Sequence, residues 1–255
     1  VQLLIMYYVI FANSDVSPAT VAIVTFGINM CSGQRGRGLR YNLRYAGCRD
    51  YISLRSLLTT GNIVNTDFAY DRLPRTLDPF DQEAMDKRGI EFYATVTNCL
   101  TGKPEYIRVT DCFAQMDVIR ASASLPFVSR PVMLNGVPYL DGGLTDNIPL
   151  DYCLRTCDKV VVVLTRPKGY ERRENLVPLA RLFYPQFKGL HEALRHRDDN
   201  YNERIRQLET LEHDGRITLI RPSAHIPVGR LESNPAKLQA IYDLGVKDAQ
   251  EYKSL

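Results

Sequence analysis

The 255-residue sequence has no long hydrophobic run. Its two apolar stretches, at residues 1–12 and 21–28, are shorter than the roughly 18–20 residues that a membrane-spanning helix needs. The start also lacks the basic flank that precedes the apolar core of a signal peptide. We therefore predict two buried strands, or a strand and a helix, within residues 1–28, with a membrane-inserted segment as the less common alternative.

Charge of one sign is not in excess, because 32 basic residues stand against 29 acidic ones and the formal net charge is +3. That balance argues against a nucleic-acid partner. It does not by itself establish an attraction to anionic lipid. With 45% hydrophobic and 24% charged residues, the composition is that of an ordinary globular protein, and the chain is long enough to bury a sizeable core.

Several cofactor motifs are missing. The six scattered cysteines show no zinc-like spacing with one another or with histidines, so we predict reduced thiols and no metal site. The glycine-rich basic segment at residues 32–38 lacks the Gly-Lys-Ser/Thr ending of a phosphate-binding loop. No Gly-x-Gly-x-x-Gly motif follows a strand either. A nucleotide-binding α/β enzyme is therefore a rival hypothesis that only tight ATP or NAD binding would revive.

What is present is a set of strand, turn and helix signals. Residues 3–11 are charge-free and β-rich, which predicts a buried parallel strand. The remaining elements are predicted from apolar periodicity and turn residues: a hairpin of strands at 90–97 and 105–109, a helix at 111–123, a hairpin turning at Asn135-Gly136, a central strand at 160–164, a strand at 217–220, and helices within 172–212 and 235–252. Residues 59–80 are predicted to be a long surface loop with short helical pieces.

The composition changes near residue 166, where a highly charged, helix-prone region begins. We predict a three-layer α/β domain with a mostly parallel central sheet over residues 1–165. A helical C-terminal extension over residues 166–255 is predicted to follow it.

The most informative stretch is RASASLPFVSRPVMLNGVPYLDGGLTDNIP, at residues 120–149. In it, a helix that ends in small residues and a proline leads through a hairpin to Asp141-Gly142-Gly143. An acyl hydrolase needs a nucleophile activated by an adjacent base, and a carboxylate within hydrogen-bond reach of a serine can be that base. The two glycines let the backbone turn tightly and leave room for a substrate. An isolated Asp-Gly-Gly more commonly caps a turn, so the surrounding pattern is what favours a functional Asp141.

In order and spacing, these features resemble the patatin-like family of lipid acyl hydrolases. Residues 32–37, 60–63 and 77–79 are similar to other parts of that family, and residues 219–242 resemble the C-terminal extension of a bacterial branch. The resemblance implies hydrolysis of acyl esters of lipids by a Ser-Asp dyad. It implies that Asp141 is the base, that Gly142 and Gly143 support it, and that no metal or organic cofactor takes part.

The first 31 residues depart from the family pattern. They contain neither its Gly-rich oxyanion-hole loop nor its Gly-x-Ser-x-Gly nucleophile elbow. Ser17, at the centre of DVSPA, is the better candidate nucleophile, although both glycines of the elbow are replaced. Thr25, at the centre of IVTFG, keeps the second glycine, but its extra methyl would crowd an elbow. An ordinary loop serine and an ordinary strand threonine are the commoner outcomes. A truncated start, an inactive family member and an unusual nucleophile all stay open as explanations.

We therefore predict a serine-type carboxylic ester hydrolase that acts on lipids. The alternative is a catalytically inactive or truncated patatin-like domain that acts as a lipid-binding or regulatory module. The expected partner is a lipid or acyl-ester substrate and not a nucleic acid, while peripheral membrane contact and the oligomeric state stay open. We expect a cytoplasmic location, with or without membrane association. The apolar residues Val128, Val132, Met133 and Leu134 are candidates for exposure to lipid, with core packing the commoner outcome.

Overall fold

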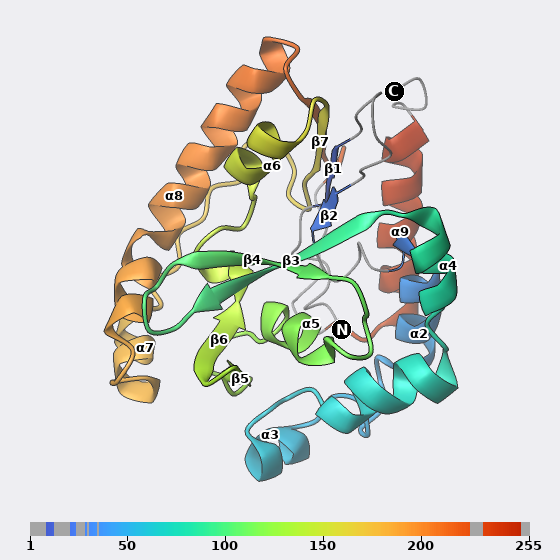
Figure 1. The fold of residues 1–255 in the computed structure, drawn as a ribbon, viewed down its shortest axis with the longest axis vertical. Helices are drawn as coiled ribbons and strands as arrows, with labels where there is room; N and C mark the ends of the chain where they lie inside the picture. The colour runs from blue at the N-terminus through green and yellow to red at the C-terminus, as the bar shows by residue number, and fades with distance from the viewer. Residues whose placement is uncertain are drawn as a thin grey trace.

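A computed structural model describes the backbone of residues 9–12 and 21–23 and, with side chains, residues 29, 31–34, 36–224 and 232–250 (Figure 1). The elements in chain order are β1 (Val9–Ala12), β2 (Val21–Ile23), α2 (Arg37–Tyr45), α3 (Leu54–Thr60), η2 (Phe68–Leu77), α4 (Gln82–Arg88), β3 (Glu91–Asn98), β4 (Pro104–Val109), α5 (Met116–Ser122), β5 (Val132–Leu134), β6 (Val137–Asp141), η3 (Gly142–Leu144), α6 (Leu150–Thr156), β7 (Val160–Val163), α7 (Val177–Phe183), α8 (Lys188–His213), β8 (Thr218–Ile220) and α9 (Pro235–Gln250).

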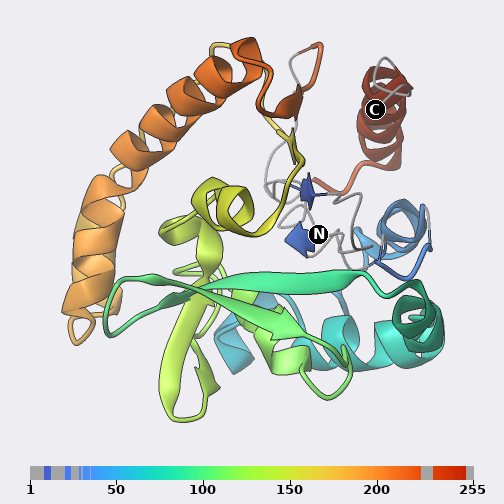
Figure 2. The same cartoon turned by 45° about the horizontal axis from the view of Figure 1, so that its top comes forward.

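The described strands form two sheets. One has three strands in the order β1-β7-β8, and the other has five, in the order β2-β3-β6-β5 with β4 also paired to β3. Helices lie around both sheets, with α8 along one side and α2, α4 and α9 on the opposite side (Figures 1 and 2). The predicted mixed α/β class is confirmed.

The prediction of a mostly parallel sheet is wrong. Among the described strands, only β2 with β3 and β7 with β8 pair in parallel. The pairs β1/β7, β3/β4, β3/β6 and β5/β6 are antiparallel. The reason lies partly in loop length, because a tight turn can join only antiparallel neighbours, whereas a parallel pair needs a crossover of a dozen or more residues. The two predicted hairpins, β3/β4 and β5/β6, are both confirmed.

The β5/β6 hairpin turns where the sequence predicts. Asn135 and Gly136 both have positive φ, at 50° and 82°. Two consecutive left-handed residues form the turn whose twist matches that of the flanking strands, and Asn-Gly is the sequence that adopts it most readily. The turn sends β6 back along β3, with Val96 opposite Asp141.

Strand β3 is the centre of the larger sheet, and its side chains alternate between two environments. Phe92, Ala94 and Val96 are buried against residues of α5, which include Ile119 and Ala121. Residues at odd positions lie on the other face, because successive side chains in a strand point to opposite sides. On that face, the Thr97 hydroxyl bonds to Thr145, just after η3. Both faces of β3 are therefore covered.

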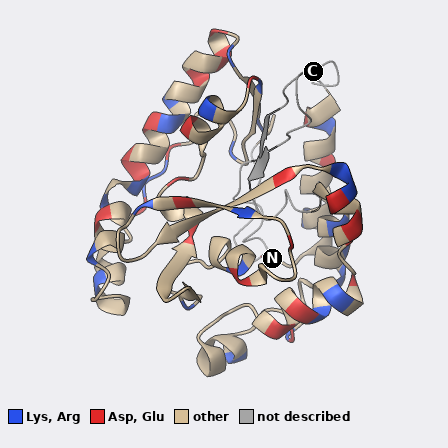
Figure 3. Ribbon diagram, viewed as in Figure 1, with Lys and Arg blue, Asp and Glu red and all other residues tan. Residues whose placement is uncertain are grey.

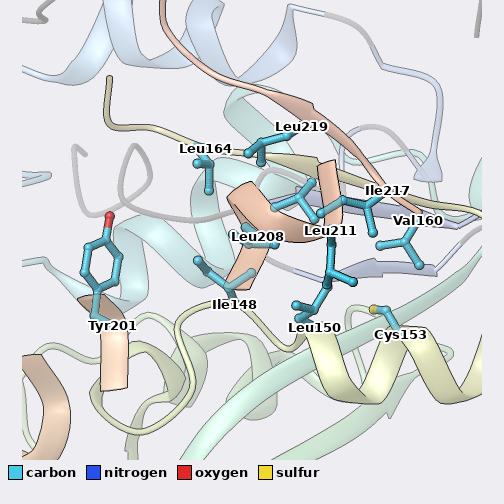
Figure 4. Close-up of a cluster of buried hydrophobic side chains, with 11 residues drawn as sticks. Ile148, Leu150, Cys153, Val160, Leu164, Tyr201, Leu208, Leu211, Ile217 and Leu219 are labelled. Carbon is cyan, nitrogen blue, oxygen red and sulfur yellow. The ribbon is translucent and has the colours of Figure 1, made fainter. Parts of the chain in front are cut away.

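The smaller sheet is covered by α6 and α8 (Figure 4). Side chains from the chain before and within α6, from β7, from α8 and from β8 form one buried cluster: Ile148, Leu150, Cys153, Val160, Val162, Leu164, Tyr201, Leu208, Leu211, Ile217 and Leu219. Residues beyond 166 thus complete a sheet and a core that earlier residues begin. The division into a domain at 1–165 and an extension at 166–255 stays a proposal.

Three local predictions differ from the structure. The first strand is Val9–Ala12 and antiparallel to β7, while residues 1–8 lie outside the described residues. The predicted helix at 111–123 is confirmed only as α5, because the Asp111 carboxylate accepts the amides of Phe113 and Ala114 and so makes a turn first. The predicted loop at 59–80 contains the ten-residue η2, a wide helix that includes Pro74.

No helix in the described part of the chain is both long enough and apolar enough to cross a membrane. The predicted helix at 235–252 is confirmed as α9, which packs beside α2.

Candidate active site

Asp141 ends β6 and begins η3, and its position is fixed from three directions. Its backbone N–H donates to the Ser124 carbonyl at 2.9 Å, and its carbonyl accepts from the Thr97 hydroxyl at 2.7 Å. Its carboxylate Oδ1 accepts the Gly143 N–H at 2.7 Å. The residue is only 1% exposed. A buried carboxylate held this rigidly is suited to a defined chemical role, because its geometry is set before a substrate binds.

The absence of a side chain at Gly142 allows the chain at the end of β6 to pass close to the backbone of β3. A Cβ on Gly142 would lie 2.3 Å from the Thr95 carbonyl oxygen and 2.5 Å from its carbonyl carbon. No side chain fits there, which is why the residue after Asp141 is a glycine. The buried Thr95 hydroxyl has no hydrogen-bond partner among the described residues, so it is a polar group at this junction that a further group can satisfy.

The loop after Asp141 is held by residues on both sides of it. The Asn147 side-chain amide donates to the Gly143 carbonyl at 2.6 Å. Arg197 of α8 reaches the same carbonyl, with 3.4 Å from its Nε, and its other end pairs with Glu174 at 2.9 Å. Burial lowers the pKa of the Arg197 guanidinium. Both Gly142 and Gly143 therefore have structural roles around Asp141, and their support of a catalytic base stays a prediction.

Strands β2 and β6 meet end to end beside Asp141. β4 occupies one edge of β3 over Phe92–Thr97, so β2 and β6 must share the opposite edge. β2 runs parallel to β3 and ends at Ile23 opposite Tyr93, while β6 runs the other way and ends at Asp141 opposite Val96. Three residues of β3 span about 10 Å, so the end of β2 lies roughly that far from Asp141 along this edge, and β2 points toward it.

The two candidate nucleophiles lie on either side of β2 in the sequence. Ser17 precedes the strand and Thr25 follows it, and both lie outside the described residues. The pairing of Asp141 with Ser17 stays a prediction.

The described serines and cysteines nearest to Asp141 have other roles. The Ser124 hydroxyl donates to the Arg120 carbonyl at 2.7 Å, which is the bond of a helix end. Burial raises the pKa of the Cys99 thiol to about 12, so this thiol stays protonated and is a poor nucleophile. Within the described residues there is also no group of three or more His, Cys, Asp or Glu side chains that would hold a metal ion.

A pocket of about 420 Å³ is lined by residues 145–148, which follow η3, and by residues of β4, α6 and α8. Its walls are polar. The Tyr106 hydroxyl donates to Asp146 at 2.5 Å, and Arg204 grips the Asp151 carboxylate with bonds of 2.7 and 3.0 Å. Asp141 does not line this pocket. Its polar lining does not suit an acyl chain, so we do not assign it to lipid.

Comparison with known proteins identifies the family of the chain. A model of the patatin-like phospholipase family matches residues 20–154, just over half of the chain. The chain belongs to the patatin-like phospholipase family. The match contains Asp141, Gly142, Gly143 and Thr25, while Ser17 precedes it.

A second family model, described as Domain of unknown function (DUF6363), matches residues 187–254 of this patatin-like chain. The chain is also 25% identical over 225 residues to "Uncharacterized protein YjjU" of Escherichia coli (strain K12). That similarity covers 83% of this chain and 61% of the relative, so the chain spans less than two thirds of that protein's length.

Sequence reasoning missed two residues that fix the Asp141 loop in this patatin-like chain. The sequence pattern predicts Thr97 only as an ordinary strand residue. Its hydrogen bond to the Asp141 carbonyl depends on the register between β3 and β6. Arg197 is one of many charges on α8, but it is 5% exposed whereas its neighbour Arg195 is on the surface. Only the helix periodicity, with Leu190, Leu194 and Tyr201 on the buried side, could have indicated that Arg197 lies inward.

Proposed function

We propose that this chain is a lipid acyl hydrolase in which Asp141 is the general base. The observation that carries the proposal is the end-to-end meeting of β2 and β6 on one edge of β3. The end of β2, after which the family pattern has its nucleophile, and the buried carboxylate that ends β6 lie on the same edge of β3, and this arrangement supports the proposal. Family membership supports the substrate class, which is an ester of a fatty acid.

The reaction needs one hydroxyl and one carboxylate. The hydroxyl oxygen attacks the ester carbonyl carbon while its proton passes to the Asp141 carboxylate. The carbon–oxygen bond to the alcohol then breaks, and Asp141 returns the proton to the leaving alkoxide. Water next attacks the acyl-enzyme, giving its proton to Asp141 and releasing the fatty acid as the hydroxyl is regenerated.

Two hydroxyls compete for the nucleophile. Ser17 is favoured chemically, because a primary hydroxyl is less hindered than the secondary one of threonine. Thr25 is favoured by chain direction, because it follows β2 and β2 runs toward Asp141. Neither sequence has the full Gly-x-Ser-x-Gly pattern, and that departure supports the alternative function, an inactive patatin-like domain that binds lipid without cleaving it.

A fluorophosphonate probe, followed by mass spectrometry of the labelled peptide, separates these outcomes. Labelling at Ser17 or Thr25 that disappears in Asp141→Asn supports the dyad and identifies its nucleophile. Hydrolysis of a p-nitrophenyl ester should fall about 10²- to 10⁴-fold in the same variant. Asp151→Asn, a carboxylate exposed beside the polar pocket, is the matched control and should keep both labelling and hydrolysis. A folded chain that neither labels nor hydrolyses the ester would leave the inactive lipid-binding domain as the function.

A further inference from the structure

Exposed apolar side chains gather on one surface of the molecule. Among the described residues, eight large apolar side chains are strongly exposed, and six of them lie on α3, β5 and α7: Leu54, Leu58, Met133, Leu179, Leu182 and Phe183. We call this surface the apolar edge. Leu58 is 85% exposed and Leu182 is 72% exposed, which is costly in water unless something covers them.

The three elements of the apolar edge are linked by one stretch of chain. Residues 126–131 run between them and bond to both ends. The Ile63 N–H, just beyond α3, donates to the Val128 carbonyl at 2.8 Å. At the other end, the Phe127 ring meets the Phe183 ring of α7 edge-on, with 5.7 Å between centroids. In Figure 1, α3, β5 and α7 accordingly lie along the lower border of the fold.

The charge of the apolar edge has one sign. Residues 54–60, 126–134 and 177–188 contain no aspartate or glutamate, although the whole chain has 29 acidic residues. The same segments contain four exposed basic residues: Arg55, Arg130, Arg181 and Lys188. None of these four residues forms an ion pair with another described residue. On α8, by contrast, the surface arginines Arg195 and Arg206 form ion pairs with glutamates. Figure 3 shows the contrast, with α8 banded in red and blue and with α3 and β5 mostly tan.

We propose that the apolar edge docks this chain on an anionic phospholipid surface. Apolar side chains flanked by unpaired cations and without acids match the layering of such a surface, where phosphates lie above acyl chains. Leu58, Leu182 and Phe183 enter the acyl boundary, and the basic side chains contact phosphates. A partner protein with an acidic apolar face has no comparable support, since a lipid surface is where the family substrate resides.

The apolar edge is also connected to the candidate active site. Met133 of β5 lies opposite Pro138, and Asp141 follows three residues later on the same strand. That separation is about 10 Å along β6. Docking through this edge would therefore hold Asp141 near the lipid. The inference rests on the proposed function for its purpose, but the binding itself requires no hydrolysis.

Vesicle binding tests the inference without involving catalysis. We would measure co-sedimentation of the whole chain with vesicles of ether-linked phosphatidylglycerol and phosphatidylcholine, which have no acyl ester to cleave, and with ether-linked phosphatidylcholine alone. The chain should bind the anionic vesicles more tightly than the neutral ones. Leu58→Gln and Phe183→Gln should each weaken binding, and together should weaken it about tenfold or more. Val246→Gln is the matched control, because Val246 is 44% exposed on α9, away from the edge.

The basic residues are tested in the same way. Arg55→Gln with Arg181→Gln should weaken binding to anionic vesicles about tenfold and leave binding to neutral vesicles unchanged. Arg216→Gln, beyond the C-terminal end of α8, is the control and should bind like the unchanged chain. Circular dichroism of each variant shows whether it is folded. Because Leu58 is almost fully exposed, Leu58→Gln removes no packing contact in the core, so a loss of vesicle binding in this variant cannot come from unfolding.

Three results would overturn the inference. They are no binding of the unchanged chain to anionic vesicles, equal binding by the Leu58→Gln variant, and a self-association that Leu58→Gln abolishes while vesicle binding persists. Asp141→Asn keeps the two proposals distinct. If the chain binds vesicles but hydrolyses no ester, the hydrolase proposal fails alone. If the chain hydrolyses a soluble ester but binds no vesicle, only the proposal of a lipid-docking surface fails.

Discussion

The Arg197 guanidinium on α8 lies 3.4 Å from the Gly143 carbonyl oxygen, two residues after Asp141. The bond joins the region matched by the second family model to the loop that carries the candidate base. Arg197 is also paired with Glu174 at 2.9 Å, so one buried cation connects three parts of the chain. The C-terminal region is thus part of the support of the candidate active site.

Replacing Arg197 by methionine should destabilise the protein. The change removes the ion pair between Arg197 and Glu174 and one of the two side-chain donors to the Gly143 carbonyl, and breaking a buried pair typically costs about 3–5 kcal/mol. Because the Glu174 side chain is 33% exposed, we expect the lower end, about 3 kcal/mol. The midpoint of urea unfolding measures the change. Arg195→Met on the same helix is the control, since that surface pair with Glu192 is worth about 0–1 kcal/mol. Equal losses in both variants would contradict the buried role of Arg197.

Gly142→Ala should fail for steric reasons. The new Cβ would lie 2.3 Å from the Thr95 carbonyl oxygen, and backbone atoms cannot move aside as a flexible side chain could. Overpacking commonly costs about 1–3 kcal/mol, and we expect about 3 kcal/mol or more here. Gly47→Ala is the control, because its Cβ would meet nothing within 4 Å and should change stability by less than about 0.5 kcal/mol. Thermal unfolding compares the two, and a Gly142→Ala variant that melts with the parent would show that β3 and β6 are not this close.

The two carboxylates of the polar pocket should give opposite pH effects. Removal from water raises the pKa of Asp146, so the folded state holds its proton more tightly than the unfolded chain does. Its contribution to stability is therefore largest below about pH 3.9 and is lost as the pH rises through the folded pKa. Asp146→Asn should gain stability relative to the parent between pH 4 and pH 7, since an amide oxygen can still accept the Tyr106 hydroxyl.

Asp151 provides the matched opposite case. Its bonds to Arg204 lower its pKa, so its contribution to stability is present above about pH 3.9 and is lost as the pH falls through the folded pKa. Because this carboxylate is 55% exposed, Asp151→Asn should cost only about 0.2–1 kcal/mol at pH 7. Urea unfolding of both variants at several pH values checks the pair, and slopes of the same sign would refute the assignment.

Local signals in the sequence predict much of the fold. The Asn135-Gly136 turn, the β3/β4 hairpin and the helix α9 follow from turn chemistry and periodicity, because each depends on residues close in the chain. The direction in which strands pair does not follow from such local signals. β3 pairs with β2 in parallel and with β6 antiparallel along one edge, and nothing within those strands specifies which neighbour arrives.

The candidate site divides in the same way. Asp141 and its two glycines are adjacent in sequence, so the pattern identifies them together. Thr97 and Arg197 reach the loop from 44 and 54 residues away, through strand register and helix packing, and a single sequence carries little trace of either contact.

Reaction with iodoacetamide should divide the six free cysteines into two groups. Cys31, Cys99, Cys112 and Cys153 are buried, and burial raises the pKa of each thiol to about 12. Cys48 and Cys157 are partly exposed. Because the thiolate is the reactive form and must be reached, only the last two should be labelled quickly in the folded chain at pH 7.5.

Mass spectrometry of the peptides identifies the labelled sites, and labelling in guanidinium chloride should reach all six thiols. The double variant Cys48→Ser, Cys157→Ser should then label slowly under native conditions. Rapid labelling of Cys99 in that variant would mean that the core between β3 and α8 opens readily. It would also mean that a thiol close to Asp141 along the sheet is accessible, and Cys99 would then have to be tested beside Ser17 and Thr25 as the nucleophile.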